Sequence, residues 1–540
     1  MKKIISILLV LILSLTMVTP VFADSIVIDF GDVAGEPGDV DVDTVVTSAD
    51  LITLRKILLG TIEAQSKKTA DVNEDGQVDI IDLVRLKKNL VNYTKYPAYL
   101  ENPMSSIYDF QANVLRNDIL SIKDELPESV TGTVWYISPS GKSTNSGKLA
   151  DSAWDSLATY NEKRGRINAG DAVLFERGGV YRGSFFVRDG VYYGAYGSGE
   201  KPVINGSAMD YANATWTEES ENLWVCAESI SKDAGIVVFN EGSFMGYKKP
   251  EKSQLSQNGD FWYDSTNQKI YMYMEKNPTS AYKSIEIGTN DMLVTITGKN
   301  NVTIENLCLK NTGGHGIYIE KDSSNVTIRG CAIGFIGGSY LSGTTRYGNG
   351  IEIWKAATNV LMEYNWVYQI YDSGLTTQGA GEYIVKDITM RKNLIEYCGM
   401  GSFEYFLAGA WEVCRGENVI FADNICRFAG YNWAGEQRPD KVSKHIRSDY
   451  SCPNAIFNFQ IKNNIFDQSA VDLIGLGGTA VTLTDIPQNP APVMSGNRYA
   501  QNANGGFGTY FQRTNVVFDN YIDYFIENNL GDTKAGIYKY

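Results

Sequence analysis

Oxygen-bearing side chains alternate along residues 71–82, in the pattern that a cation-binding loop requires. Calcium takes six to eight oxygen ligands, and a loop of twelve residues supplies them from alternate positions and a final carboxylate. Positions one, three, five, nine and twelve of this stretch are Asp71, Asn73, Asp75, Asp79 and Asp82. Gly76 stands at position six, where such a loop turns sharply, and apolar residues at helical spacing follow. The stretch therefore predicts a calcium loop that leads into a helix.

A second copy of this loop begins 32 residues upstream. Its corresponding side chains are those of Asp39, Asp41, Asp43, Thr47 and Asp50. A repeated motif is stronger evidence than a single match, so we predict two calcium ions. Thr44 occupies the position of the turn glycine, and we expect the first site to be weaker or distorted for that reason.

Three further acidic residues lie far downstream, at Glu352, Asp372 and Glu404. Two carboxyl groups that flank a glycosidic bond can hydrolyse it when one is a protonated acid and the other is a charged base or nucleophile. Crowding of like charges raises the pKa of one group and so separates the two roles. We predict that these three residues form the catalytic group, in which Asp372 could replace either partner.

The elements that must position these acids are short strands that recur beyond residue 290. Each unit holds β-branched stretches separated by Asn and Gly, with a period of about 20 to 30 residues. Leucine-rich spacing and long helical periodicity are absent, so the units predict a right-handed parallel β-helix. The asparagines expected to stack in one row are Asn306, Asn365, Asn393, Asn424 and Asn464, with Gly330 in place of one of them. Cys308 and Cys331, one unit apart, are expected to stack in the core.

One strand of each unit aligns with its neighbours on Gly316, Gly350 and Gly374. Side chains alternate along a strand, so each strand has an inward and an outward set. We expect the inward set to be Ile317, Ile319, Ile351, Ile353, Leu375, Thr377, Phe403 and Tyr405. We expect the outward set to be Tyr318, Glu352, Trp354, Thr376, Gln378 and Glu404. Neighbouring coils are about 4.8 Å apart, which places the backbones of Glu352 and Glu404 about 9–10 Å apart, two coils away from each other.

Two insertions, residues 339–347 and 432–453, precede this same strand and should rise on the same side of the solenoid. They carry polar side chains suited to binding sugar hydroxyls or carboxylates, and we predict substrate contacts for Arg346, Tyr347, Arg438 and His445, with Arg447 a further loop cation. Trp354 shares the outward face with Glu352 and could stack on a sugar ring.

Composition limits the possible partners and location of the protein. The net charge of −15 and the isoelectric point of about 4.8 argue against a nucleic-acid partner. Two histidines exclude zinc sites built on several of them, and seven cysteines form no disulfide framework in a chain of 540 residues. Residues 1–23 carry two lysines, an apolar run and a small-residue cleavage site, which predict a signal peptide. No later apolar run is long enough to span a membrane, so we expect a secreted, extracellular protein.

The paired calcium loops resemble a type I dockerin, because position twelve is Asp in both and one helix follows each loop. The resemblance covers residues 35–95 and predicts a dockerin domain at residues 24–95. It implies two structural calcium ions, a cohesin module of a scaffoldin as partner, and a place in a cellulosome. By the same resemblance, the cohesin contacts would centre on Ser48, Ala49, Arg55, Lys56, Ile80, Ile81, Lys87 and Lys88.

The solenoid resembles the β-helix carbohydrate-active enzymes of the pectate-lyase-like superfold. The stretches "GDAVLFERGGVYRGSFFV" and "FWYDSTNQKIYMYMEKNP" resemble segments of that group, and the resemblance implies a β-helix catalytic domain at residues 133–540. It also implies plant cell-wall polysaccharide as substrate. The superfold hosts lyases, hydrolases, epimerases and adhesins, so the fold alone fixes no reaction.

Three functions remain open from the sequence. The leading one is a glycoside hydrolase that acts on hemicellulose or pectin through the outward acids. A polysaccharide lyase would instead need Lys or Arg as base, and Lys355, Arg391 and Lys392 are available. A non-catalytic β-helix would bind polysaccharide through its aromatics. Residues 96–132 are expected to be a linker with a helix that caps the open end of the solenoid, and residues 520–531 are expected to cap the other end.

Overall fold

The computed structural model describes residues 28–29, 37–42, 45–73, 75–92, 106, 108–380, 383–408, 414–440, 442–450, 456–476, 492–502, 505–510 and 537–539. The predicted signal peptide and the predicted C-terminal cap lie outside these residues. The chain divides into two compact units, the first made of residues 1–96 with 103–113 and the second of residues 97–102 with 114–540.

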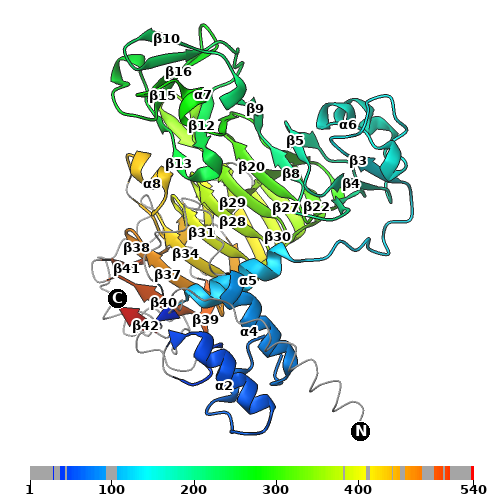
Figure 1. Ribbon diagram of the computed structural model, residues 1–540, viewed down its shortest axis with the longest axis vertical. Coiled ribbons are helices and arrows are strands. Elements are labelled where there is room, and N and C mark those ends of the chain that lie inside the picture. The colour runs from blue at the N-terminus through cyan, green and yellow to red at the C-terminus, as the bar shows by residue number, and fades with distance from the viewer. Residues whose placement is uncertain are drawn as a thin grey trace. The chain divides into compact units, whose positions relative to one another are not determined.

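The first unit has one helix after each predicted calcium loop (Figure 1). Its elements are β1 (Ile28–Asp29), β2 (Val45–Val46), α2 (Ser48–Leu58), α3 (Lys67–Ala70) and α4 (Ile80–Asn92). α2 begins at a capping box, in which the Thr47 side chain accepts a hydrogen bond from the helix and Asp50 accepts one from the Thr47 N–H. The apolar side chains of Leu54 and Leu86 are fully buried, so the helical spacing seen in the sequence forms the core of this unit.

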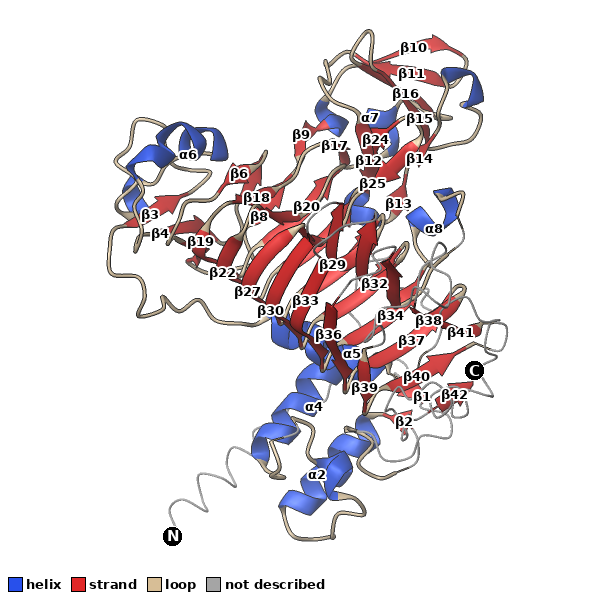
Figure 2. Ribbon diagram, turned by 180° about the vertical axis from the view of Figure 1, so that it is seen from behind, coloured by secondary structure: helices blue, strands red, loops and turns tan. Residues whose placement is uncertain are grey.

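The second unit is built around three long parallel sheets, and each coil of the chain adds one strand to each (Figure 2). The first, called here the site sheet, contains β6 (Phe185–Phe186), β18 (Val294–Thr297), β21 (Ile317–Glu320), β26 (Ile351–Trp354), β29 (Ser373–Ala380), β32 (Gly401–Ala408), β35 (Ile446–Tyr450), β38 (Asp472–Leu476) and β41 (Gly506–Tyr510). This stacking is the predicted parallel β-helix.

The second and third sheets complete each coil. The second contains β3 (Val134–Ile137), β4 (Ala172–Glu176), β7 (Tyr192–Tyr196), β19 (Asn300–Glu305), β22 (Ser323–Arg329), β27 (Ala356–Glu363), β30 (Tyr383–Arg391), β33 (Cys414–Ala422), β36 (Ile456–Lys462) and β39 (Val493–Ser495). The third contains β5 (Val180–Arg182), β8 (Val203–Asn205), β20 (Cys308–Thr312), β23 (Ala332–Ile336), β28 (Trp366–Ile370), β31 (Leu394–Cys398), β34 (Ile425–Ala429), β37 (Ile465–Ser469), β40 (Arg498–Gln501) and β42 (Ile537–Lys539). Their inward apolar side chains form one continuous core.

The register of the site sheet confirms the predicted inward and outward sets. Ile351 pairs with Leu375, and Leu375 pairs with Phe403. All eight predicted inward side chains are at most 1% exposed. Because the pairing also aligns Phe403 and Tyr405 with the inward rows, the expected outward direction of Glu404 is confirmed.

A row of buried asparagines runs between the second and third sheets. Each side-chain amide donates to the carboxamide oxygen of the next asparagine at 3.0 Å, in the order Asn365, Asn393, Asn424, Asn464 and Asn497. Asn306 and Gly330 were predicted in this row, and that was wrong. Both occupy the preceding left-handed turn position, with φ of 59° and 64°. Strand pairing places Cys308 beside Ala332, so the predicted stacking of Cys308 on Cys331 was wrong by the same single residue.

Residues 207–289 interrupt the coil with two mainly antiparallel sheets, a feature that the sequence analysis did not predict (Figure 1). One contains β10 (Trp216–Ser220), β11 (Leu223–Cys226), β16 (Lys269–Tyr273), β15 (Asp260–Asp264) and β14 (Tyr247–Lys248). The other contains β13 (Phe244–Met245), β12 (Ala234–Phe239), β17 (Ile285–Thr289) and β9 (Ser207–Asp210). They share an apolar core of their own, so the predicted β-helix at 133–540 carries an inserted subdomain.

The helices of the second unit are short, and one of them corrects a prediction. They are α6 (Leu157–Lys163), α7 (Pro278–Ala281) and α8 (Trp433–Gln437), together with the second half of α5 (Asp109–Leu120). α5 was expected to cap the open end of the solenoid. Instead Arg116 pairs with Glu396 on β31 and lies 5.1 Å above the Trp366 ring on β28. These strands are in the middle of the third sheet, so this part of α5 covers a side of the coil.

Candidate functional site

The register of the site sheet brings two of the predicted acids into one row. Glu352 pairs with Thr376, and Thr376 pairs with Glu404. Asp372 immediately precedes β29, the strand between them. The three residues are only 3%, 9% and 4% exposed for Glu352, Asp372 and Glu404 respectively. Buried carboxylates require specific partners, which makes their contacts informative.

Glu352 is held by two neighbours. His315 Nε2 lies 2.8 Å from Glu352 Oε2, and Asn349 Nδ2 donates to the same oxygen at 3.0 Å. Burial raises the pKa of Glu352, but the contacts with His315 and Asn349 outweigh it and hold that pKa below its usual range. Glu352 is therefore suited to remain an anion. The sequence analysis gave His315 no role in the site. The only signal that could have drawn attention to it is that the chain contains just two histidines.

Asp372 has the opposite tendency. Its Oδ1 pairs with Arg438 Nη1, and its Oδ2 accepts a hydrogen bond from the Gly348 N–H at 2.8 Å. Burial and the nearby charge of Glu404 nevertheless raise the pKa of Asp372 above its usual range, against the effect of Arg438. Asp372 is therefore the carboxyl group best suited to carry a proton. Arg438, predicted as a loop residue near substrate, is part of this arrangement.

Glu404 is held by three donors. Arg447 Nη1 lies 2.9 Å from Glu404 Oε1. The Ser373 hydroxyl donates to Glu404 Oε2 at 3.0 Å, and Gln378 Nε2 donates to it at 3.2 Å. A carboxylate that accepts several hydrogen bonds is oriented and stabilised as an anion. The site thus combines two carboxylates held by ion pairs and hydrogen-bond donors, Glu352 and Glu404, with a third, Asp372, whose pKa is raised.

Two loops rise beside these acids on the same side, as predicted. The first is the hairpin of β24 (Ser339–Ser342) and β25 (Thr345–Tyr347), and the second contains α8. Arg346 Nη1 joins them by donating to Gln437 Oε1 at 3.0 Å. The remaining nitrogens of Arg346 donate to backbone carbonyls, so this guanidinium supports the wall of the site. The Tyr347 ring meets the His315 ring edge-on, with 4.9 Å between their centroids.

The inserted subdomain extends the same wall. Gln437 Nε2 donates to the Gly246 carbonyl at 2.9 Å, and the Tyr340 N–H donates to Asp233 Oδ2 at 2.7 Å. Lys248 also pairs with Asp233 at 2.6 Å. These contacts connect the insertion to both loops. The insertion, the hairpin and α8 therefore border one side of the candidate site.

His445 was predicted as a substrate-binding loop residue, and the structure corrects that prediction. The side chain is 0% exposed and stacks against Phe466. Its Nδ1 lies 3.0 Å from Ser402 Oγ, and its Nε2 lies 3.2 Å from two backbone carbonyls. Burial lowers the pKa of His445 to about 4, so it is a neutral core residue. Trp354, in contrast, lies half-buried on the outward face of β26, beside Gln378 of the next strand.

The second predicted calcium loop is closed by hydrogen bonds within its own segment. Gly76 has a φ of 87°, which supports the sharp turn expected there. Asp71 accepts hydrogen bonds from the N–H groups of Asp75 and Gly76, at 3.1 and 2.8 Å. Asp82 accepts from those of Asn73 and Asp79, at 3.1 and 2.8 Å. The final carboxylate thus closes the loop back onto its beginning.

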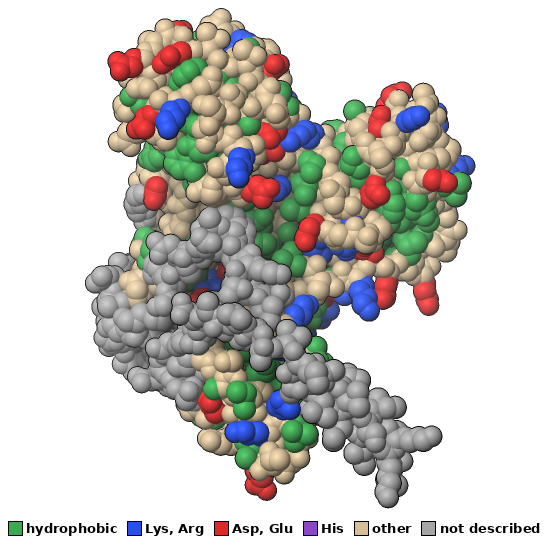
Figure 3. All heavy atoms as spheres, viewed as in Figure 1, with side chains coloured by type: hydrophobic (Ala, Val, Ile, Leu, Met, Phe, Trp, Pro, Cys, Tyr) green, Lys and Arg blue, Asp and Glu red, His purple; other side chains and the backbone are tan. Residues whose placement is uncertain are grey.

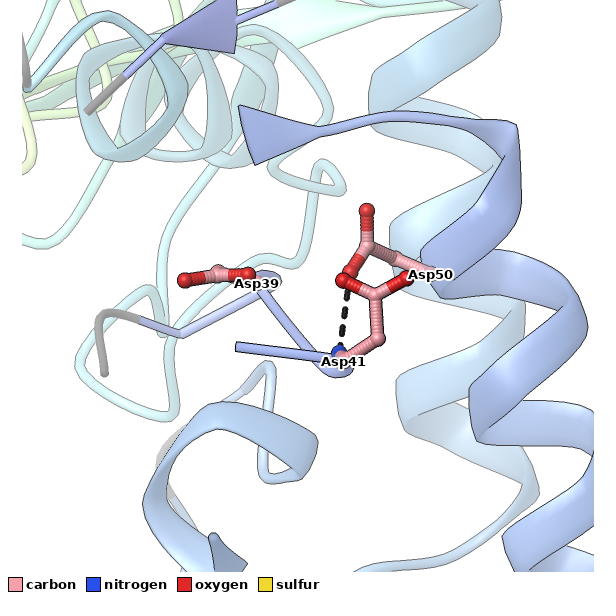
Figure 4. Close-up of side chains that lie close together, drawn as sticks. All are labelled: Asp39, Asp41 and Asp50. Carbon is pink, nitrogen blue, oxygen red and sulfur yellow. Dashed lines mark hydrogen bonds between the residues drawn. The ribbon is translucent and has the colours of Figure 1, made fainter. Parts of the chain in front are cut away.

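The first loop gathers carboxylates in the same way (Figure 4). Oxygens of Asp39, Asp41 and Asp50 all lie within 4.8 Å of one another. Asp50 accepts a hydrogen bond from the Asp41 N–H at 3.2 Å, and burial raises the pKa of Asp50 to about 7. Three crowded carboxylates, two of them fully buried, fit a hard divalent cation that compensates their charge. Asp43 and Thr44 lie outside the described residues.

On the face shown in Figure 3, acidic and basic side chains are interspersed over the described surface. Among the described residues, none of the helices is both long enough and apolar enough to cross a membrane.

Comparisons with known families agree with the two-part organisation. Residues 37–91 match the dockerin type I domain, and residues 228–395 and 294–437 match the right handed beta helix region. The chain therefore combines a type I dockerin domain near its N-terminus with a right-handed β-helix. Type I dockerin domains bind calcium and pair with cohesins.

Several solved structures align with this chain at low identity. A glycoside hydrolase aligns at 11% identity with a TM-score of 0.40, over 76% of this chain and 96% of its own. The GH136 lacto-N-biosidase from Eubacterium ramulus aligns at 13% identity and 0.39, over 79% of this chain and 64% of its own. Pectate lyase Pel9A aligns at 11% identity and 0.37, over 71% of this chain and 78% of its own. No curated protein sequence matches the chain.

Proposed function

We propose that the β-helix is a glycoside hydrolase that degrades plant cell-wall polysaccharide, either hemicellulose or pectin. The observation that carries this proposal is the contrast between buried carboxyl groups on adjacent coils. The pKa of Asp372 is raised and that of Glu352 is lowered, while Glu404 is paired with Arg447. Asp372 would donate a proton to the leaving oxygen, and one of the two neighbouring carboxylates, Glu352 or Glu404, would be the anionic base or nucleophile.

The surroundings of the basic residues favour hydrolysis over β-elimination. A lyase needs an unpaired Lys or Arg near the substrate to abstract a proton. Arg438 and Arg447 are each paired with a carboxylate of the site. Arg391 ends β30 on the second sheet and pairs with Glu363. Lys355, exposed directly after β26, is the base that the lyase alternative would use.

The dockerin would deliver this activity to a cellulosome. Two structural calcium ions would be held by Asp39, Asp41, Asp43, Thr47 and Asp50 in the first loop and by Asp71, Asn73, Asp75, Asp79 and Asp82 in the second. The cations would offset the charge of the crowded carboxylates and so stabilise the loops. The partner would be a cohesin module, and the protein would be exported to meet both cohesin and substrate.

Product chemistry tests the reaction directly. The full chain is incubated with xylan, arabinoxylan, homogalacturonan and rhamnogalacturonan, and both reducing ends and unsaturated uronates are measured. We expect new reducing ends without unsaturated products from at least one substrate. Unsaturated products that disappear in Lys355→Ala would replace the hydrolase by a lyase. Binding of a polysaccharide without any new reducing ends would instead indicate a non-catalytic β-helix.

A further inference from the structure

Asn349 lies at the point where the coils of the candidate site meet. Its Nδ2 donates to Glu352 Oε2 at 3.0 Å, and its Oδ1 accepts a hydrogen bond from the Ser373 N–H at 3.0 Å. Ser373 in turn donates its hydroxyl to Glu404 Oε2 at 3.0 Å. Asn349 is itself only 3% exposed. One buried amide therefore links a carboxylate on β26 to the residue that orients a carboxylate on β32.

The neighbouring residue extends the link to the third acid. The Gly348 N–H donates to Asp372 Oδ2 at 2.8 Å. Gly348 has a φ of 143°, and a Cβ atom there would come within 2.1 Å of the backbone of Gly337. The turn at residues 348–349 is thus closely packed. Its two consecutive residues contact Asp372 and Glu352 at the same time.

The backbone of Asn349 also fixes the protonation of His315. The Asn349 N–H points at His315 Nδ1 at 3.0 Å. A proton on Nδ1 would oppose this donor, so the ring carries its proton on Nε2 and donates it to Glu352 Oε2 at 2.8 Å. Stacking on Tyr318, with centroids 5.5 Å apart and planes 13° apart, holds the ring in place.

We infer that His315 and Asn349 are positioning residues, a clamp that keeps Glu352 an oriented anion and ties it to the coil that carries Asp372 and Ser373. The clamp rests on the proposed hydrolase for its effect on rate, and on hydrogen-bond geometry alone for the state of His315. It assigns a role to the rare histidine that the sequence pattern left without one. His315 acts through Glu352 and contacts no reacting atom.

The titratable groups that act on Glu352 are His315, Tyr318 and Tyr347. Burial raises the pKa of both tyrosines above their usual value, so they are neutral near pH 7. Removing His315 would take away the hydrogen bond that its Nε2–H donates to Glu352, and the pKa of Glu352 would rise. If the Glu352 carboxylate is needed for the reaction, the rate falls when this group becomes protonated, which happens as pH falls through its pKa. A higher pKa would therefore move the acid limb of the rate profile to higher pH.

Four variants separate positioning from a purely structural role. We expect His315→Ala to move the acid limb of kcat/KM upward by about one pH unit or more, a size typical of losing a hydrogen-bonded partner. His315→Gln retains an N–H donor and should restore most of the shift. Asn349→Asp keeps the acceptor for Ser373 but puts a like charge beside Glu352, so it should shift the limb further than Asn349→Ala. A fall in kcat with an unmoved limb in all four would overturn the clamp.

His445 provides the matched control, since it is the other of the two histidines and is buried away from the acids. His445→Gln should leave the acid limb in place. A shift as large as that of His315→Ala would mean that losing either histidine disturbs the site nonspecifically, and the inference would fail.

Imidazole NMR tests the clamp without any activity. The full chain labelled with ¹⁵N-histidine has two pairs of ring signals, one Nδ1 and one Nε2 from each of its two histidines. We expect His315 to be neutral with its proton on Nε2 at pH 7. A doubly protonated ring or an Nδ1–H tautomer would overturn the clamp even in an active enzyme. The expected tautomer in a protein that cleaves no glycan would leave the clamp standing and remove the proposed function.

Discussion

The two calcium loops and the candidate site both gather carboxylates, but they do so over very different lengths of chain. The second loop takes its ligands from residues 71–82, and its Asp71 and Asp82 are fixed by N–H groups of the same segment. The candidate site takes Glu352, Asp372 and Glu404 from three successive coils. The hydrogen bonds that join these coils through Gly348, Ser373 and Arg438 link residues 24 to 66 positions apart.

The geometry of the calcium loop and that of the acidic site depend on different parts of the structure. A loop of twelve residues acquires its geometry from local turns and needs only a cation to offset its charge. The acids of the β-helix acquire theirs from strand register, and a slip of one residue would turn them into the core. The calcium loop is therefore sensitive to chelators, and the acidic site is sensitive to the packing of the solenoid. Each can be disturbed while the other stays intact.

Calcium removal should give the largest contrast between the regions. With EDTA, we expect binding to a cohesin module to be lost completely, because the crowded carboxylates of Asp39, Asp41 and Asp50 repel one another without a cation. Hydrolysis by the β-helix should continue at its original rate. Calorimetry with cohesin and a reducing-end assay on the same sample measure both. Loss of hydrolysis on chelation would mean that the β-helix itself needs a cation.

Neutralising the acids should give the reverse result. We expect Glu352→Gln, Asp372→Asn and Glu404→Gln each to lower kcat/KM by about 10²–10⁴-fold, the usual contribution of an acid or base, with cohesin binding unchanged. The matched control is Glu363→Gln on β27, since this glutamate pairs with Arg391 at 2.8 Å on another sheet. Wild-type rates in Glu352→Gln and Glu404→Gln would remove both residues from the mechanism.

Acid should weaken the β-helix through His445. Its pKa is lowered to about 4 by burial, below the ordinary value of 6.5. The unfolded chain therefore binds a proton first, and the stability present above pH 6.5 is lost as pH falls toward 4. We expect a loss of up to about 3 kcal/mol over this range. Denaturant titrations of wild type and His445→Gln check it, and identical pH dependence in the two would contradict the expectation.

The asparagine row should give the smallest effect. Asn393 accepts from the Asn365 amide at 3.0 Å and donates to the Asn424 carboxamide oxygen and the Met362 carbonyl, at 3.0 and 2.9 Å. We expect Asn393→Ala to lower the free energy of unfolding by about 1–3 kcal/mol, the cost of unsatisfied buried groups. The exposed counterpart is Asn359, whose φ of 54° suits glycine. A cost for Asn359→Gly equal to that of Asn393→Ala would show that burial does not set the value.

The predicted alignment of the site sheet succeeded because strand alternation is a local rule. Glu352 and Glu404 were placed on the outward face by period-two patterning alone. The asparagine row failed at Asn306 and Gly330, because both the row and the preceding left-handed turn accept Asn. Residue type alone therefore does not distinguish the asparagine row from the turn position that precedes it.

The histidines show where local patterns stop being informative. His445 was expected near substrate and lies in the core, whereas His315 was given no role and contacts Glu352. Both outcomes depend on which coil lies above which, a matter of pairings across 22 to 43 residues. The inserted subdomain at residues 207–289 was not predicted either, because its sheets depend on pairings between distant strands, such as β9 with β17.

The sequence by itself determined the calcium loops, the helices that follow them, the repeating coil and the outward direction of the acids. Each of these follows from turns, helical spacing or strand alternation within a few residues. Only the tertiary structure decided that Asp372 is the acid with a raised pKa and that Glu352 is held as an anion. A pKa depends on burial and on charges that the stacking of coils brings close together. Neither can be predicted from the residues of a single strand.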